Sequence, residues 1–166
     1  MNPIERELAH VPRWCIVRTI RQQSVAEHAF FVARYAATIS TLMGVEPSAT
    51  MLQYALHHDD EELHSGDIPT PYKRKIRVPE TTSILEIMLS EEEVKIVKIA
   101  DMMEAALFLV DEQLMGNKTV HLILEQLRNE LAEACGSLTL KKGGESLAYW
   151  CNLQIDAHMH YKGRVA

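Results

Sequence analysis

Apolar residues recur every three or four positions in five stretches of the chain, and this spacing is typical of amphipathic helices. The stretches cover residues 24–44, 48–63, 90–116, 117–136 and 145–160. No stretch alternates apolar and polar residues with the two-residue period of a half-buried strand. The chain contains no internal repeat, low-complexity tract or long linker. The pattern therefore predicts an all-α protein, with residues 1–166 forming a single helical domain.

Capping residues give the expected limits of these helices. Two stretches begin with a serine followed three residues later by a glutamate, the spacing of a capping box in which each side chain bonds the other residue's backbone N–H. These pairs are Ser24 with Glu27 and Ser90 with Glu93. Glycines are placed to end the same two helices, at Gly44 and Gly116. Pro47 suits the first turn of the 48–63 helix, and two prolines in "SGDIPTPY" cannot continue it.

Composition and charge exclude several classes of function. The net charge of -6 argues against a nonspecific nucleic-acid binder, which needs a basic face, but it leaves room for a small anionic substrate. Cys15, Cys135 and Cys151 are few and widely spaced, which indicates free thiols in a reducing compartment. The start "MNPIERELAHVPR" lacks the features of a signal peptide, and no apolar run reaches membrane-spanning length. We therefore expect a cytoplasmic protein that binds neither nucleic acid nor membrane.

The stretch "YALHHDDEELHSGDIPTP", residues 54–71, contains three histidines and five acidic residues, and no lysine follows until Lys73. A solvated helix face would intersperse cations among so many carboxylates. On a helix, Asp59 is adjacent to His58 and Glu62 lies one turn beyond it on the same face, whereas His57 points about 100° away. His58 is therefore the histidine expected to act at a site, and His57 is expected to support it or to pack.

Two further polar residues lie among apolar ones. His28 is one turn into the first long helix, where a lone histidine is more often a hydrogen-bonded core residue than a ligand. Asp101 sits within "VKIVKIADMMEAALFL", where its simplest role is a salt bridge to Lys98. Taken together with His58 and Asp59, however, they form a set of two nitrogen and two oxygen donors that suits Zn²⁺, Mn²⁺ or Co²⁺ better than Ca²⁺. Such an ion can activate water for attack on a phosphate ester.

The order of His28, His58-Asp59 and a distant Asp101 resembles the H…HD…D signature of the HD-domain metal-dependent phosphohydrolases, an all-α superfamily with a metal site between helices. Three blocks resemble, in order and spacing, those of bacterial 5′-deoxynucleotidases and of compact phage dATP triphosphohydrolases. The blocks are "RWCIVRTIRQQSVAEH", "HDDEELHSGDIPTP" and "KIADMMEAALFL". They cover most of residues 13–110, and the two C-terminal helices carry no motif of this kind.

The resemblance implies a role for each matching residue. The implied metal ligands are His28, His58, Asp59 and Asp101. Glu62 is implied as the residue that handles the proton of the water or leaving group, and Asp67 as a second catalytic residue near the sugar. The implied substrate-binding residues are Arg13 for phosphate, Trp14 for stacking on the base, Ile16 against the purine edge, Pro71, and Lys73 and Lys98 for the phosphate chain. The resemblance also implies a deoxynucleotide substrate and a homo-oligomer, in the host cytoplasm if a phage encodes the chain.

Two branches of the superfamily do not match. Guanosine-tetraphosphate hydrolases have an HDxxED pattern, in which Leu63 replaces the final aspartate here, and the cyclic-dinucleotide branch has a GYP motif that this sequence lacks. A 5′-deoxynucleotidase and a dATP triphosphohydrolase stay open. The short chain, Ile16 and the two lysines favour the second, with selectivity for adenine over guanine and 2-aminoadenine. A non-catalytic nucleotide-binding HD module is the other alternative, against which the intact ligand set and Glu62 argue.

Overall fold

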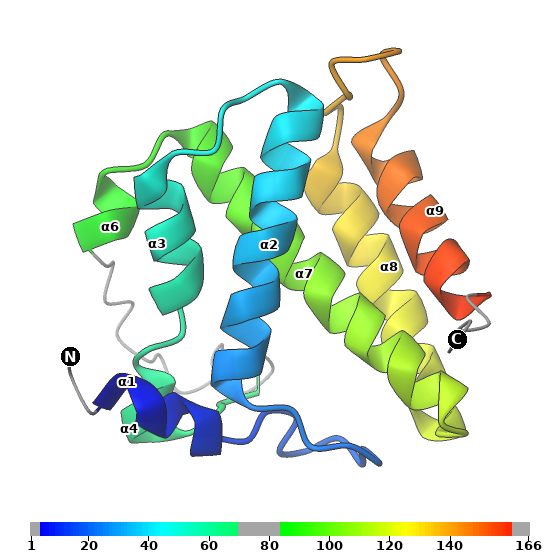
Figure 1. Cartoon of the computed structure of the whole chain (residues 1–166). Coiled ribbons are helices and arrows are strands. Elements are labelled where there is room, and N and C mark those ends of the chain that lie inside the picture. Colours follow the sequence, from blue (N-terminus) through cyan, green and yellow to red (C-terminus); the bar gives the residue numbers. More distant parts are fainter. Residues whose placement is uncertain (1–3, 70–83, 161–166) are drawn as a thin grey trace, which may run out of the picture.

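The computed structural model describes residues 4–69 and 84–160, and within them the regular structure is entirely helical (Figure 1). The helices in chain order are α1 (Ile4–Glu7), η1 (Leu8–His10), α2 (Val25–Met43), α3 (Ala49–His57), α4 (Glu62–Ser65), α6 (Ile84–Ile87), α7 (Glu91–Leu114), η2 (Lys118–Val120), α8 (His121–Cys135) and α9 (Leu147–Met159). Bridges between Pro12 and Ser24 and between Thr139 and Ser146 are isolated pairs outside any strand. The all-α prediction is confirmed. None of these described helices is long and apolar enough to cross a membrane.

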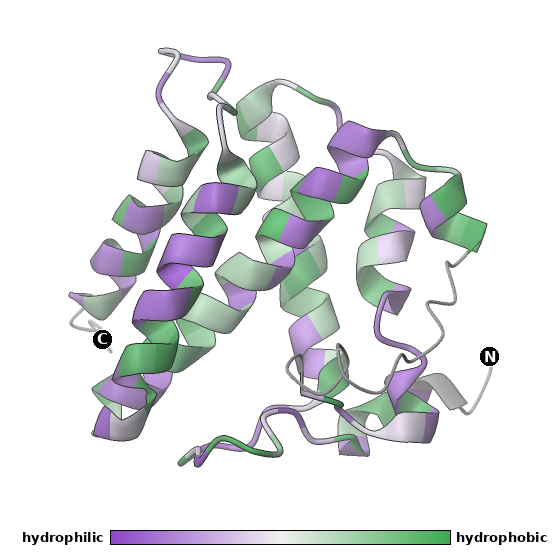
Figure 2. Cartoon of the chain, turned by 180° about the vertical axis from the view of Figure 1, so that it is seen from behind, coloured by the Kyte–Doolittle hydropathy of each residue, from purple (hydrophilic) through white to green (hydrophobic). Residues whose placement is uncertain are grey.

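Helix α7 runs diagonally through the bundle, and the other long helices pack on it (Figure 1). α2 and α3 contact it and one another on one side, and α8 and α9 do so on the other. Bands of hydrophilic and hydrophobic residues along α7, α8 and α9 show their amphipathic character (Figure 2). Because α7 touches both halves of the bundle, residues on it have a fixed position relative to α2 and α3.

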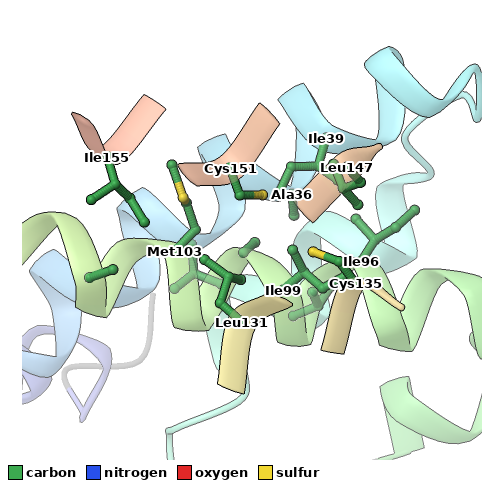
Figure 3. Close-up of a cluster of buried hydrophobic side chains, with 14 of the residues drawn as sticks. Ala36, Ile39, Ile96, Ile99, Met103, Leu131, Cys135, Leu147, Cys151 and Ile155 are labelled. Carbon is green, nitrogen blue, oxygen red and sulfur yellow. The ribbon is translucent and has the colours of Figure 1, made fainter. Parts of the chain in front are cut away.

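The buried core fixes the position of α7 in the bundle. α7 contributes Ile96, Ile99 and Met103, which meet apolar side chains from α2, α8 and α9 (Figure 3). Those partners are Ala36, Ile39, Leu131, Cys135, Leu147, Cys151 and Ile155. Burial of each large aliphatic side chain contributes about 1.5–3 kcal/mol. The cysteines Cys135 and Cys151 are free thiols within this core, and the third, Cys15, is an exposed free thiol.

The predicted ends of α2 and α7 are confirmed, with one difference in a cap. Ser90 and Glu93 form both bonds of a capping box at the start of α7. At the start of α2, Ser24 Oγ accepts the N–H of Glu27, but the Glu27 carboxylate pairs with Arg21 Nη1 in place of the return bond. The capping box predicted at Ser24 is therefore half formed, because a nearby guanidinium competes for the glutamate. Gly44 and Gly116 end the two helices with positive φ angles of 80° and 99°, which favour glycine.

The helix predicted over residues 48–63 is wrong in its second half. α3 ends at His57, His58 is its C-terminal cap, and α4 begins again only at Glu62. Carboxylates at the C-terminal end of a helix face the negative end of its dipole, so the acidic run from residue 59 to 62 favours ending α3 here. Pro47 also lies one residue before the N-terminal cap Ser48, and not in the first turn.

Candidate metal centre and active site

Three helices bring His28, His58 and Asp101 together. His28 lies in the first turns of α2, His58 at the end of α3 and Asp101 in the middle of α7, and one ligand atom from each lies within 4.8 Å of the others. His28 is fully buried, and its Nε2 is 3.1 Å from Asp101 Oδ1. Among the described residues, Asp101 pairs with His28 and not with Lys98, the alternative that the sequence allowed. Its side chain is 39% exposed, so the cluster opens to solvent on the Asp101 side.

Asp59 lies beside this cluster. Its Oδ2 is 3.4 Å from His58 Nε2 and 3.6 Å from His28 Nε2. Neighbouring ligand atoms in a tetrahedral shell with metal–ligand bonds of 2.0–2.1 Å are about 3.3 Å apart. The measured separations are close to that value before any ion is added. The donor set of imidazole nitrogens and carboxylate oxygens therefore fits a divalent ion such as Zn²⁺.

The outer nitrogens of both imidazoles are bonded to oxygens, which orients the inner ones. His28 Nδ1 is 2.5 Å from Glu104 Oε2, and His58 Nδ1 is 2.9 Å from the carbonyl oxygen of Ala55. A histidine whose Nδ1–H donates to an oxygen presents the lone pair of Nε2 to a metal, and this arrangement is general among metal-bound histidines. Glu104 was missed at the sequence level. Its signal is a second carboxylate on the face of α7 that carries Asp101, three residues later.

Charges within the cluster shift the pKa values of its members. Burial lowers the pKa of His28, but hydrogen bonds to Asp101 and Glu104 outweigh burial and raise it to about 9. Partial burial raises the pKa of Asp101, but the hydrogen bond and charge of His28, with the charges of His58 and Arg13, outweigh it and hold the pKa of this carboxyl below its ordinary range. In the metal-free protein at neutral pH, His28 therefore carries a proton that a bound cation would replace.

The two predicted catalytic carboxylates lie in different surroundings. Glu62 is buried at the start of α4, directly after the turn that carries His58 and Asp59. Asp67 follows α4, and its Oδ2 accepts the backbone N–H of Trp14 at 2.7 Å. Asp67 therefore anchors the loop that leads to α2, a contact that the sequence did not predict.

Arg13 and Trp14 belong to that loop and border the cluster. Arg13 Nη1 lies 3.7 Å from Glu104 Oε2 and is buried without a hydrogen bond to any described residue. Trp14 has a φ of 64°, which is rare for a bulky residue, and the Asp67 carboxylate bonds its N–H in this conformation. The indole stacks on Phe108 of α7, with ring centroids 5.5 Å apart and planes at 9°. One face of the indole is thus covered by the protein.

The remaining predicted substrate residues are spread more widely. Ile16 lies on the same loop as Trp14 and is 60% exposed. Lys98 is exposed on α7, one turn before Asp101. Pro71 and Lys73 lie outside the described residues.

Comparison with known proteins agrees with this geometry. A family model described as "5′-deoxynucleotidase YfbR-like" matches residues 4–83. The dATP triphosphohydrolase of cyanophage S-2L is 30% identical over 141 residues, covering 76% of this chain and 80% of that protein. The chain belongs to the HD-domain phosphohydrolases. The family that the H…HD…D residues indicated is thereby confirmed.

A second relative and a solved structure extend the comparison for this HD-domain phosphohydrolase. The 5′-deoxynucleotidase yfbR of Photorhabdus temperata is 28% identical over 153 residues, covering 74% of this chain and 78% of that protein. A solved structure of the cyanophage S-2L HD phosphohydrolase, DatZ, bound to dA and one catalytic Zn²⁺ ion, superposes with a TM-score of 0.74. It covers 96% of each chain at 23% sequence identity, which shows a shared fold.

Proposed function

We propose that this HD-domain phosphohydrolase is a dATP triphosphohydrolase, which converts dATP and water to deoxyadenosine and triphosphate. The observation that carries the proposal is the convergence of His28, His58 and Asp101 with Asp59 beside them, directly before the short helix that begins with the buried Glu62. One relative supports the substrate. The cyanophage S-2L protein is named dATP triphosphohydrolase, and the solved structure of the HD phosphohydrolase from that phage holds dA and a Zn²⁺ ion.

The four ligand candidates would hold a divalent ion through the Nε2 atoms of His28 and His58 and the carboxylates of Asp59 and Asp101. When bound, such an ion supplies a Lewis acid that polarises a phosphoryl oxygen and lowers the pKa of a water. Zn²⁺ is the ion seen in the homologous structure, and Mn²⁺ and Co²⁺ suit the same donors.

Glu62 is the residue we assign to proton transfer. Water attacks the α-phosphorus, a bond from the water oxygen to phosphorus forms, and the bond from phosphorus to the 5′-oxygen breaks. Glu62 takes the proton from the water and returns it to the 5′-oxygen, so that deoxyadenosine leaves neutral and the triphosphate is released. Its burial beside the turn of His58 and Asp59 supports this role. Asp67 supports catalysis by holding the loop between η1 and α2, residues 11–24, through the Trp14 N–H. This loop, which carries the proposed substrate-binding residues Arg13, Trp14 and Ile16, is called the substrate loop.

The loop residues supply substrate binding in this proposal. Arg13 Nη1, which is buried without a hydrogen bond among the described residues, is suited to a phosphate oxygen. Trp14, whose ring stacks on Phe108 and has its centroid 5.9 Å from Arg13 Cζ, is the residue we assign to stacking on the base, and such stacking contributes about 1–3 kcal/mol whatever the base. Lys98, one turn from Asp101, and Lys73, with Pro71 nearby in sequence, hold the β- and γ-phosphates.

Selectivity for adenine is assigned to Ile16. An apolar branched side chain fills the space beside the C2–H of adenine, but it offers no hydrogen bond to the exocyclic amine of guanine or 2-aminoadenine. A stranded amine costs about 1–3 kcal/mol, which corresponds to roughly a tenfold to hundredfold preference for dATP. The exposure of Ile16 in the absence of substrate leaves its side chain available for this contact.

The test is product analysis with Zn²⁺-loaded protein on four substrates: dATP, dAMP, dGTP and the 2-aminoadenine deoxynucleoside triphosphate. We expect deoxyadenosine and tripolyphosphate from dATP without dADP or dAMP, at least about tenfold faster than from either 2-amino nucleotide. Glu62→Gln, purified in parallel, controls for contaminating phosphatases. Faster release of orthophosphate from dAMP would favour a 5′-deoxynucleotidase. Metal and nucleotide binding without turnover would favour a non-catalytic module.

A further inference from the structure

A buried chain of hydrogen bonds connects the substrate loop to the metal cluster. Trp14 Nε1 donates to Gln23 Oε1 at 2.9 Å, and Gln23 Nε2 donates to Glu104 Oε1 at 2.6 Å. The other oxygen of Glu104 bonds His28 Nδ1 at 2.5 Å. These bonds link an indole on the loop before α2 to an imidazole of the candidate metal centre through two side chains.

Gln23 has no other way to satisfy its amide in this position. Its side chain is 1% exposed, so neither the oxygen nor the nitrogen can exchange its protein partner for water. The Glu104 carboxylate accepts only, so the Gln23 nitrogen must face Glu104 and the oxygen must face the Trp14 N–H. The orientation of the amide is fixed at both ends.

The same logic fixes the two terminal rings. The Trp14 ring has one Nε1–H, and its bond to Gln23 sets how the indole lies on Phe108. The Glu104 carboxylate can bond only a protonated Nδ1, so the proton that His28 gives up to a bound cation is the one on Nε2, which faces Asp59 and Asp101. A displacement of Glu104 would therefore be transmitted to both rings.

We propose that Gln23 and Glu104 are positioning residues that align the base-stacking indole of Trp14 with the metal-ligating nitrogen of His28. The inference rests on the proposed function, in which Trp14 contacts the base and His28 the metal. It assigns neither Gln23 nor Glu104 a contact with substrate or metal. Cation binding at His28 therefore changes the surroundings of the Trp14 ring. Because coupling between two sites is reciprocal, a ligand that binds at Trp14 changes the cation affinity at His28 by the same factor.

The loop has a second, separate anchor that provides a control. Glu112, buried near the end of α7, accepts the N–H groups of Ile20 and Arg21 at 2.6 and 2.8 Å and an N–H of Asn117 at 2.7 Å. Glu112 holds the same loop to the same helix, but among the described residues it does not hydrogen-bond to Gln23, Glu104 or His28. Glu112→Gln loosens the loop without interrupting the chain of bonds from Trp14 to His28.

The experiment uses tryptophan fluorescence and metal affinity, neither of which requires turnover. The chain has two tryptophans, so Trp150→Phe leaves Trp14 as the sole emitter. Zn²⁺ is titrated into this parent, into Gln23→Leu and Glu112→Gln in the same background, and into Glu104→Gln. Gln23→Met, which also lacks hydrogen-bonding groups, replaces Gln23→Leu if that variant does not fold.

We expect Zn²⁺ to change the Trp14 emission of the parent, Glu112→Gln to keep that change, and Gln23→Leu to lose most of it at saturating Zn²⁺. Glu104→Gln should bind Zn²⁺ about 10–100-fold more weakly, the usual effect of removing the partner of a metal-bound histidine. An unchanged Zn²⁺ response in Gln23→Leu, equal losses in Gln23→Leu and Glu112→Gln, or no response in the parent would each overturn the proposal. Because no substrate is added, these measurements test the positioning role of Gln23 and Glu104 independently of whether the protein hydrolyses dATP.

Discussion

His57 and His58 are adjacent in the chain but lie in different surroundings. The ring of His58 turns toward His28 and Asp59, with Nδ1 on the carbonyl of Ala55, whereas His57 is half exposed and its Nδ1 lies 2.8 Å from Asp60. Consecutive side chains on a helix point about 100° apart around its axis, which accounts for the difference. His58, the C-terminal cap of α3, still has helical backbone angles.

This difference gives a prediction about metal content. His58→Ala removes a ligand candidate that no neighbour can replace, so it should lose bound metal and nearly all activity, as should Asp101→Asn. His57→Ala is the matched control and should keep both. The measurement is the zinc content of dialysed protein beside its rate with dATP. Loss of zinc from His57→Ala but not from His58→Ala would reverse the assignment of the two histidines.

Glu62 can be tested separately from metal binding. Glu62→Gln keeps the size of the side chain but cannot take or return a proton, so turnover should fall by roughly two to four orders of magnitude while zinc content stays unchanged. Single-turnover rates at saturating nucleotide isolate the chemical step. If the rate is unchanged, proton transfer belongs to another group, and Asp67 is the next candidate.

Residue-level prediction was closest where the signal was local. The structure places His58, and not His57, beside His28 and Asp101, although the helix that was expected to carry both His58 and Glu62 ends before Glu62, and the role of His58 as a ligand stays a prediction. Gln23, whose amide donates to Glu104, was missed because a hydrogen bond between residues 81 positions apart leaves no periodic trace in the sequence. The contact between Trp14 and Phe108 was missed for the same reason.

Among the helices, Glu93 connects the starts of α3 and α7. Its Oε2 accepts the N–H of Ser90 to complete the capping box, and its Oε1 accepts a hydrogen bond from Ser48, the cap of α3. These hydrogen bonds lower the pKa of Glu93, and the bond from Ser48 has the largest effect. Since His58 caps the C-terminal end of α3 and α7 carries Asp101, the Glu93 carboxylate connects two helices that position residues of the candidate metal centre.

Replacing this carboxylate should therefore destabilise the fold. Glu93→Ala removes the bonds to both caps, and we expect a loss of about 1–2 kcal/mol in the free energy of unfolding, measured by urea denaturation. Glu92→Ala is the control, because it removes the same charge from the same exposed turn without breaking either cap. Equal losses in the two variants would show that helix-dipole electrostatics, not the caps, is responsible.

Helix limits were predictable where a cap defined them, as at Ser90, Gly44 and Gly116. The end of α3 was not, because residues 57–62 are all polar, so apolar spacing could neither extend the helix nor locate its end, and no capping glycine follows before Gly66. The competing effect is electrostatic: successive carboxylates after His58 oppose the helix dipole, and a new turn starts at Glu62. The break also places Glu62 on a helix of its own, α4, rather than one turn further along α3.

At the scale of the whole molecule, the candidate metal centre connects α2, α3 and α7, which pack side by side (Figure 1). α2 supplies His28, the turn after α3 supplies His58 and Asp59, and α7 supplies Asp101. In the metal-free protein, protonated His28 between Asp101 and Glu104 provides part of this connection. A bound cation would provide the same connection with a charge that does not titrate.

The stability of the metal-free protein should therefore depend on pH in a defined direction. The pKa of His28 is about 9 in the folded protein against 6.5 for the free side chain, so the folded state binds this proton more tightly. The stabilisation is fully present below pH 6.5 and is lost as pH rises through about 9. Zn²⁺ requires neutral His28, so its affinity rises over the same window.

We therefore expect the difference in Tm between the zinc-bound and metal-free protein to widen from pH 6.5 to 9, at a fixed free zinc concentration. Thermal unfolding followed by circular dichroism measures it. His28→Asn provides the comparison, because it removes the titrating group while all other groups still titrate, and its metal-free Tm should lack the decline assigned to His28. If the metal-free protein and His28→Asn show the same pH dependence between 6.5 and 9, His28 is not protonated in the folded state, and the ion pair with Asp101 does not join α2 to α7.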